Sequence, residues 1–170
     1  MSSRPSPPAL LIEPAATEAQ AKQLRSKPRR RPHYRALGAA LTQLTEPTLP
    51  LAVVGFSMGG HWAVWLSQRD YGLRAAVLYY AARAGTFRSD VDYQAHFADG
   101  DPWVSTSARA RMETALRRAG SAYTPHDYPG TAHWFAESDR VEYAKDPAEL
   151  ALTRDLEFLQ SALGARDLGG

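Results

Sequence analysis

The feature that most constrains the fold is the wholly apolar run Leu51–Val54, which is followed at once by the glycine-rich segment Gly55–Gly60. The run is short and begins directly after Pro50, which is typical of a strand buried on both faces of a parallel sheet. A helical pattern then predicts a helix from Met58 to about Arg69. We expect its buried side to hold Trp62, Val64, Trp65 and Leu66. Together these segments predict a strand, a tight turn and a helix.

Three further segments have the pattern of strands, and they are Arg74–Tyr80, Tyr93–Ala98 and Ser121–Tyr128. Because helical patterns of about ten or more residues alternate with the strands, we expect right-handed βαβ units. The predicted fold class is therefore α/β, with a mostly parallel sheet and helices on both of its faces.

Three helices are predicted besides the one that follows the glycine-rich segment. The first begins at Tyr34, and its apolar residues at helical spacing are Tyr34, Leu37, Leu41 and Leu44. The second ends at Gly120 and has on one face Ala108, Met112, Ala115, Leu116 and Ala119. The last has Asp146 as its N-cap and Pro147 at its first position. Its buried stripe is predicted to be Leu152, Leu156, Leu159 and Leu163.

The first part of the chain differs from the rest in its content of proline and of basic residues. Eight of the 12 prolines lie within the first 50 residues, and residues 1–35 hold eight Lys or Arg against two acidic residues. Such a segment buries too little apolar surface to offset the entropy of ordering. We therefore predict a weakly structured, proline-rich basic arm at 1–33, an α/β domain at 34–164 and a short tail at 165–170. Within the arm, Leu10–Ile12 is long enough for only a very short strand.

The net charge of +2 and the apolar pattern limit the choice of partners. The basic run Lys22–Arg35 offers only His33 and Tyr34 for base stacking, so we favour a solvated linker and expect no nucleic-acid partner. The longest apolar run, Ala75–Ala82, is too short to span a membrane. Residues 1–8 lack the apolar core of a secretory signal. These observations predict a soluble, cytoplasmic protein with no membrane partner.

The glycine-rich segment also has the pattern of a catalytic turn. The chain has no cysteine, so a nucleophile must be an oxygen or a lysine. Gly55-Phe56-Ser57-Met58-Gly59 matches G-x-S-x-G between a strand and a helix, the context that a nucleophile elbow requires. We expect Gly55 and Gly59 to remove side chains that would clash, and Ser57 to have a strained backbone. The alternative is a glycine-rich turn whose serine has no function.

A serine nucleophile needs a base, and the base needs an acid that orients it. Asp101 follows the predicted strand 93–98 and is the candidate acid, with Asp99 as the alternative. His133 follows the predicted strand 121–128 and is the candidate base. Since the carboxyl ends of parallel strands share one rim, Ser57, Asp101 and His133 should converge there. The remaining histidines, which we interpret as structural, are His33, His61, His96 and His126.

Three segments resemble the dienelactone hydrolase family of α/β-hydrolases. They are Val53–Gly60, Phe97–Val104 and Tyr128–Phe135, and the similarity extends over about residues 34–163. The order serine, aspartate, histidine is that of α/β-hydrolases. The resemblance implies an α/β-hydrolase-like fold whose catalytic triad is Ser57, Asp101 and His133, with the backbone amide of Met58 as one oxyanion donor.

The resemblance also implies an activity. It predicts a serine-dependent carboxylic ester or lactone hydrolase that acts on a small molecule through an acyl-enzyme and needs no metal or organic cofactor. Members that cleave dienelactone have cysteine at the elbow and an arginine four residues after the histidine. This chain has Ser57 and Glu137 at those positions, which favours a general serine esterase, because a carboxylate would repel an anionic lactone.

The family's first strands, and the loop that donates the second oxyanion amide, should precede Tyr34, where this chain is basic and rich in proline. We therefore predict that the early strands are missing. A sheet without them exposes an edge and apolar surface, which favours a homo-oligomer. The alternative function is a catalytically degenerate α/β-hydrolase remnant that serves as a binding or oligomerising module.

Overall fold

The computed structural model describes residues 30–44 and 50–164. The chain divides into two compact units, Met1–Pro47 and Thr48–Gly170. Most of the predicted basic arm, including Leu10–Ile12, and the predicted tail lie outside the described residues. The three-part division by composition stays a prediction.

Helix α2 (Arg30–Leu44) is the described element of the first unit. The predicted start at Tyr34 is wrong, because the helix begins four residues earlier and includes Pro32. Proline is compatible with this position, since the amides of the first helical turn have no acceptor within the helix.

The second unit is built on a parallel sheet of four strands in the order β1-β2-β3-β4. The strands are β1 (Leu51–Phe56), β2 (Leu73–Tyr79), β3 (Asp92–Ala98) and β4 (Tyr123–Tyr128). All four were predicted, and no end differs from its predicted place by more than two residues. The parallel arrangement brings the carboxyl ends of all four strands to one rim.

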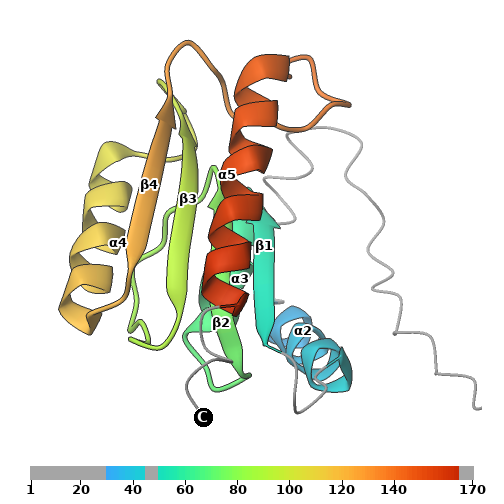
Figure 1. Cartoon of the computed structure of the whole chain (residues 1–170), viewed down its shortest axis with the longest axis vertical. Helices are drawn as coiled ribbons and strands as arrows, with labels where there is room; N and C mark the ends of the chain where they lie inside the picture. The colour runs from blue at the N-terminus through green and yellow to red at the C-terminus, as the bar shows by residue number, and fades with distance from the viewer. Residues whose placement is uncertain (1–29, 45–49, 165–170) are drawn as a thin grey trace, which may run out of the picture. The chain divides into compact units, whose positions relative to one another are not determined.

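Helices cover both faces of this sheet. They are α3 (Met58–Ser67), α4 (Thr106–Ala119) and α5 (Lys145–Gly164). Helix α3 joins β1 to β2 and α4 joins β3 to β4, so right-handed crossovers in the same direction put both helices on one face. Helix α5 lies across the other face, in front of the sheet in Figure 1. This confirms the predicted α/β class. None of the helices in the described ranges is long and apolar enough to cross a membrane.

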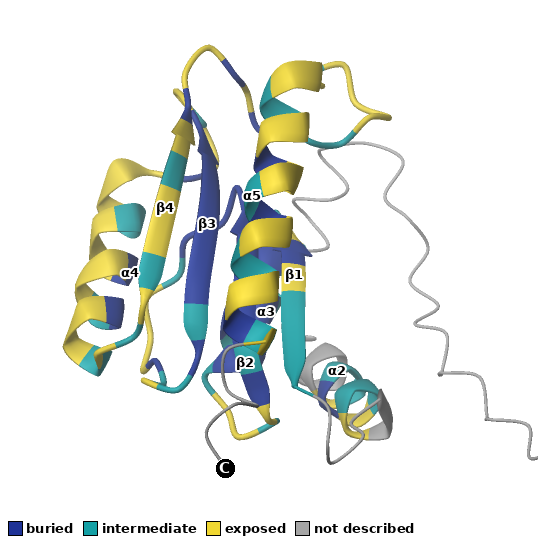
Figure 2. Ribbon diagram, viewed as in Figure 1, coloured by how far each residue is buried: buried dark blue, intermediate teal, exposed yellow. Residues whose placement is uncertain are grey.

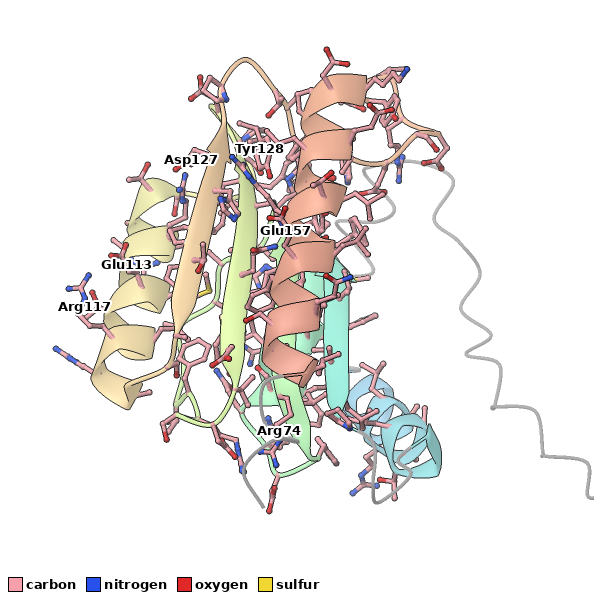
Figure 3. The ribbon with its side chains drawn as sticks, viewed as in Figure 1. Arg74, Glu113, Arg117, Asp127, Tyr128 and Glu157 are labelled. Carbon is pink, nitrogen blue, oxygen red and sulfur yellow. The ribbon has the colours of Figure 1, made fainter. Side chains whose placement is uncertain are left out.

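The core lies between the central strands and the helices, and Figure 2 shows β3 buried along most of its length. Met112 and Leu116 of α4 are fully buried in the same core, and the helix is capped by Gly120, whose φ of 74° is left-handed. The predicted face and end of α4 are thus confirmed. On the outer side of α4, Arg117 donates to Glu113 at 2.7 Å (Figure 3).

The prediction that the first strand is buried on both faces is wrong. Strand β1 is the edge of the sheet in the described structure, and its Val54 and Phe56 side chains are exposed. An edge strand has a neighbouring strand on one side only, so its apolar sequence does not by itself bury it.

The predicted buried stripe of α5 is wrong for two of its four leucines. Leu152 and Leu156 are 57% and 54% exposed, whereas Leu159 is partly buried and packs against the core. The fully buried residues of the helix are Ala151, Asp155 and Ala162. Three side chains of the sheet hydrogen-bond to Asp155, which fixes the rotation of the helix about its axis. The predicted N-cap is wrong as well, because the helix begins at Lys145 and Asp146 lies in its first turn.

The buried side of α3 differs in part from its prediction. Val64 and Leu66 are buried, but Trp62 and Trp65 are only partly so. Small residues, Gly60, Ala63 and Ser67, complete the buried side. They let the helix lie close to the sheet, where a tryptophan would not fit.

Candidate active site

The structure brings together Ser57, His133 and Asp101 at the carboxyl rim of the sheet. They follow β1, β4 and β3 respectively. Ser57 Oγ lies 2.9 Å from His133 Nε2, and His133 Nδ1 lies 2.7 Å from Asp101 Oδ2. These distances form one continuous line of hydrogen bonds from the hydroxyl to the carboxylate.

The turn that carries Ser57 has a strained backbone, as predicted. Ser57 has φ 50° and ψ −113°, and its side chain makes no capping bond to α3. Its amide donates to the Tyr79 carbonyl of β2 at 2.8 Å. Such angles cost a non-glycine residue about 1–3 kcal/mol and persist only where the surroundings impose them. The turn therefore directs the hydroxyl away from the helix and toward His133.

Gly55 and Gly60 are the glycines that this turn requires, so the prediction is confirmed for Gly55 but not for Gly59. A β-carbon on Gly55 would overlap the Gly59 carbonyl, and one on Gly60 would overlap the Ala81 side chain. A β-carbon on Gly59 would meet nothing within 4 Å, so the prediction that Gly59 itself relieves a clash is wrong. Gly59 contributes its carbonyl group, whose oxygen would overlap a β-carbon at position 55.

Asp101, and not its alternative Asp99, contacts the imidazole. The Asp101 and His133 side chains are both almost fully buried, whereas Asp99 is exposed. The second carboxylate oxygen of Asp101 accepts the Trp103 amide at 2.7 Å. With both oxygens accepting, the carboxylate is fixed in place and can hold one orientation of the histidine ring.

Met58 follows Ser57 directly and begins α3. The first amides of a helix have no intrahelical acceptor, and for this reason helix starts commonly bind anionic groups. The second amide donor that the resemblance implies would precede Tyr34, in a segment described only from Arg30 onward.

Aromatic rings surround the imidazole, and sequence reasoning did not single them out. The His133 ring centroid lies 4.7 Å from that of Trp134, 5.0 Å from that of Tyr80 and 6.1 Å from that of Trp103. Trp134 and Tyr80 both have a left-handed backbone, with φ of 73° and 48°. These rings give the histidine an apolar surrounding on several sides.

One carboxylate lies near this aromatic group. Glu137 is 26% exposed, and its Oε1 is buried without a hydrogen-bond partner in the described structure. Its Oε2 lies 3.8 Å from Arg140 Nε. Burial raises the pKa of the Glu137 carboxyl, and the Arg140 guanidinium opposes that rise. Glu137 is also close enough to His133 for their charges to interact.

A second buried histidine and aspartate lie away from Ser57. His96 Nε2 is 2.7 Å from Asp155 Oδ1, and His96 Nδ1 is 2.7 Å from the hydroxyl of Tyr128 at the end of β4 (Figure 3). Asp155 also accepts from Tyr79 at 2.6 Å and from Gln94 at 2.7 Å. The network joins α5 to three strands, which agrees with a structural role for His96. The sequence feature that could have indicated this buried network is the pair Gln94 and His96, two polar residues on one face of a buried strand.

The described residues contain no group of three or more His, Asp or Glu side chains arranged to hold a metal ion. The sheet, its covering helices and a serine in a strained turn after the first strand together define an α/β-hydrolase fold.

The family model for the dienelactone hydrolase family matches residues 13–163. The chain belongs to this family. A search of curated proteins finds no match.

Solved structures share the fold at low sequence identity. A dienelactone hydrolase-like promiscuous phosphotriesterase from metagenomic libraries is 17% identical, with a TM-score of 0.68 over 85% of this chain and 67% of its own. A carboxylesterase from Bacillus cereus is 16% identical, with a TM-score of 0.53 over 72% of this chain and 59% of its own. The chain covers only 57% to 67% of the length of several such structures.

Replacing Gly55 by alanine tests the steric requirement of the turn. We expect Gly55→Ala to lower the free energy of unfolding by about 1–3 kcal/mol, because the new β-carbon overlaps the backbone. Gly59→Ala is the matched control, with open space at its β-carbon, and should cost nothing or stabilise α3 slightly. Urea denaturation of both variants measures the difference. Equal losses in the two variants would contradict the requirement.

The raised pKa of Glu137 predicts a pH-dependent stability. When folding raises the pKa of a carboxyl, the folded state favours the protonated form of that group. The contribution to stability is therefore complete at a pH below the ordinary pKa, and it is lost as the pH rises through the raised pKa. Glu137→Gln should therefore raise the Tm at pH 7, and the gain should vanish near about pH 4. Glu157→Gln removes the same charge from an exposed position of α5 and should change the Tm little. A gain that persists at low pH would contradict burial as the cause.

Proposed function

We propose that the chain is a hydrolase of carboxylic esters or lactones that uses Ser57 as nucleophile, His133 as base and Asp101 as orienting acid. The observation that carries this proposal is the unbroken hydrogen-bonded line between the three side chains. Membership of the dienelactone hydrolase family supports hydrolase chemistry at this rim.

The contacts of Asp101 determine the proton positions that this mechanism needs. A carboxylate only accepts hydrogen bonds, so His133 Nδ1, 2.7 Å from Asp101 Oδ2, carries the ring proton. His133 Nε2 is then unprotonated and accepts the Ser57 hydroxyl proton. As that proton moves to Nε2, Ser57 Oγ attacks the substrate carbonyl carbon.

The attack places a negative charge on the carbonyl oxygen, and we assign the Met58 amide, at the start of α3, as one donor to that oxygen. Collapse of this intermediate breaks the ester bond, and the imidazolium gives its proton to the leaving alkoxide. A water molecule activated through His133 then attacks the acyl-enzyme, and the acid product leaves with Ser57 restored.

The surroundings of His133 favour a neutral, apolar ester or lactone. Trp103 and Trp134 lie with their ring centroids 6.2 Å apart beside the imidazole, and such rings suit an apolar group of the substrate. Glu137 adds a partly buried negative charge near the same histidine, which disfavours an anionic substrate.

The exposed edge of the sheet supports a second candidate function. Val54 and Phe56 of β1, with Leu152 and Leu156 of α5, are exposed apolar residues, and such residues suit association with another chain. A degenerate remnant that only binds or oligomerises would associate through them but would turn over no ester.

Ester turnover tests the triad. The chain should hydrolyse p-nitrophenyl acetate, and Ser57→Ala should lower kcat/KM by at least about 10³-fold. Ser107→Ala, an exposed serine of α4, is the control and should not change it. Turnover that is unchanged in Ser57→Ala would exclude Ser57 as the nucleophile.

Charge selection by Glu137 is tested with two substrates. Glu137→Gln should raise kcat/KM for an anionic dienelactone by about tenfold, since a like charge is removed, and leave that for p-nitrophenyl acetate within about twofold. Glu157→Gln again serves as the exposed control. An equal change for both substrates would show that Glu137 does not select by charge.

A further inference from the structure

Two consecutive tyrosines at the end of β2 link the turn of Ser57 to the loop of His133. The first, Tyr79, holds the turn. Its carbonyl accepts the Ser57 amide at 2.8 Å, and its ring stacks on that of Phe56, the residue before Ser57, at 4.4 Å. Its hydroxyl donates to the buried Asp155 carboxylate at 2.6 Å. Tyr79 is therefore fixed at both its backbone and its side chain.

Tyr80 follows with a left-handed backbone. Its φ is 48°, and its amide donates to the His96 carbonyl of β3 at 2.9 Å. Successive side chains of an extended strand point to opposite faces of the sheet. Here the ring centroids of Tyr79 and Tyr80 are only 5.6 Å apart, so the left-handed residue breaks that alternation. A left-handed backbone is uncommon for an aromatic residue and is found where surrounding contacts impose it.

The side chain of Tyr80 contacts the loop that carries His133. It is 1% exposed, and its ring centroid lies 5.0 Å from that of His133 and 5.3 Å from that of Phe135. Its hydroxyl accepts the Ala136 amide at 2.8 Å. One side chain thus contacts the imidazole and also fixes the backbone three residues beyond it.

We propose that Tyr80 is a positioning residue that sets the distance between Ser57 Oγ and His133 Nε2. Tyr79 is hydrogen-bonded to the turn of Ser57, and Tyr80 is hydrogen-bonded to the loop of His133. The distance between Ser57 Oγ and His133 Nε2 therefore depends on these two adjacent residues. Tyr80 acts through His133 and needs no contact with substrate. The inference rests on the proposed function, in which a misplacement of about 1 Å costs about 10²-fold in rate.

Two substitutions separate the hydroxyl from the ring. Tyr80→Phe keeps the ring and removes the acceptor of the Ala136 amide, so kcat should fall about tenfold while KM stays within about twofold. Tyr80→Gly suits the left-handed backbone but removes the ring as well, and kcat should fall about 10²-fold. The phenylalanine variant should therefore retain part of the activity that the glycine variant loses.

Tyr128→Phe is the matched control. Tyr128 is also a buried tyrosine at the end of a strand, but its hydroxyl contacts His96 and not the loop of His133. Its loss should lower the Tm and leave kcat within about twofold. If Tyr80→Phe and Tyr128→Phe lower kcat equally, the effect is one of stability and the proposal is overturned.

A second measurement does not depend on turnover. The proton on His133 Nδ1, held by Asp101, should give a low-field NMR resonance. We expect Tyr80→Phe to shift or broaden it and Tyr128→Phe to leave it unchanged. An unchanged resonance in Tyr80→Phe overturns the proposal. If the unaltered chain hydrolyses no ester, the proposed function fails, and this resonance alone decides whether Tyr80 positions His133.

Discussion

The hydrogen bond from the Ser57 amide to the Tyr79 carbonyl is the interaction on which the site depends. It ties the end of β1 to the end of β2 while Ser57 has a backbone conformation that few residues adopt. The packing around Gly55 and Gly60 is so close that neither position has room for a β-carbon. The strain is therefore imposed by the sheet, and it directs the hydroxyl to the rim where His133 and Asp101 lie.

A buried polar network stabilises the same region from the other face of the sheet. Asp155 of α5 accepts hydrogen bonds from three strand residues and so fixes both the helix and the Tyr79 hydroxyl. Buried carboxylates are tolerated when they are fully hydrogen-bonded. The consequence is an orientation of α5 that leaves Leu152 and Leu156 exposed. The hydrogen bonds of Asp155 thus orient the helix together with the packing of Leu159 against the core.

The sequence predicted the features whose causes are local. Strands β1 and β2 have short apolar runs, and the turn at Ser57 is recognised from the strand and helix that flank it. Asp101 and His133 could be predicted because parallel strands bring their carboxyl ends together. The features that the sequence did not predict depend on tertiary partners: the exposure of Val54 and Phe56 on β1, the rotation of α5 about Asp155, and the contacts of Tyr80 with the His133 loop.

The most direct test of the proposed triad is covalent labelling of the chain with an activated phosphonate, followed by intact-mass analysis. An activated serine should gain one phosphonyl group, and Ser57→Ala should gain none. His133→Asn should be labelled far more slowly, since the base is gone while the serine remains. An unlabelled chain, or an equal adduct in Ser57→Ala, would contradict the assignment of Ser57 as nucleophile.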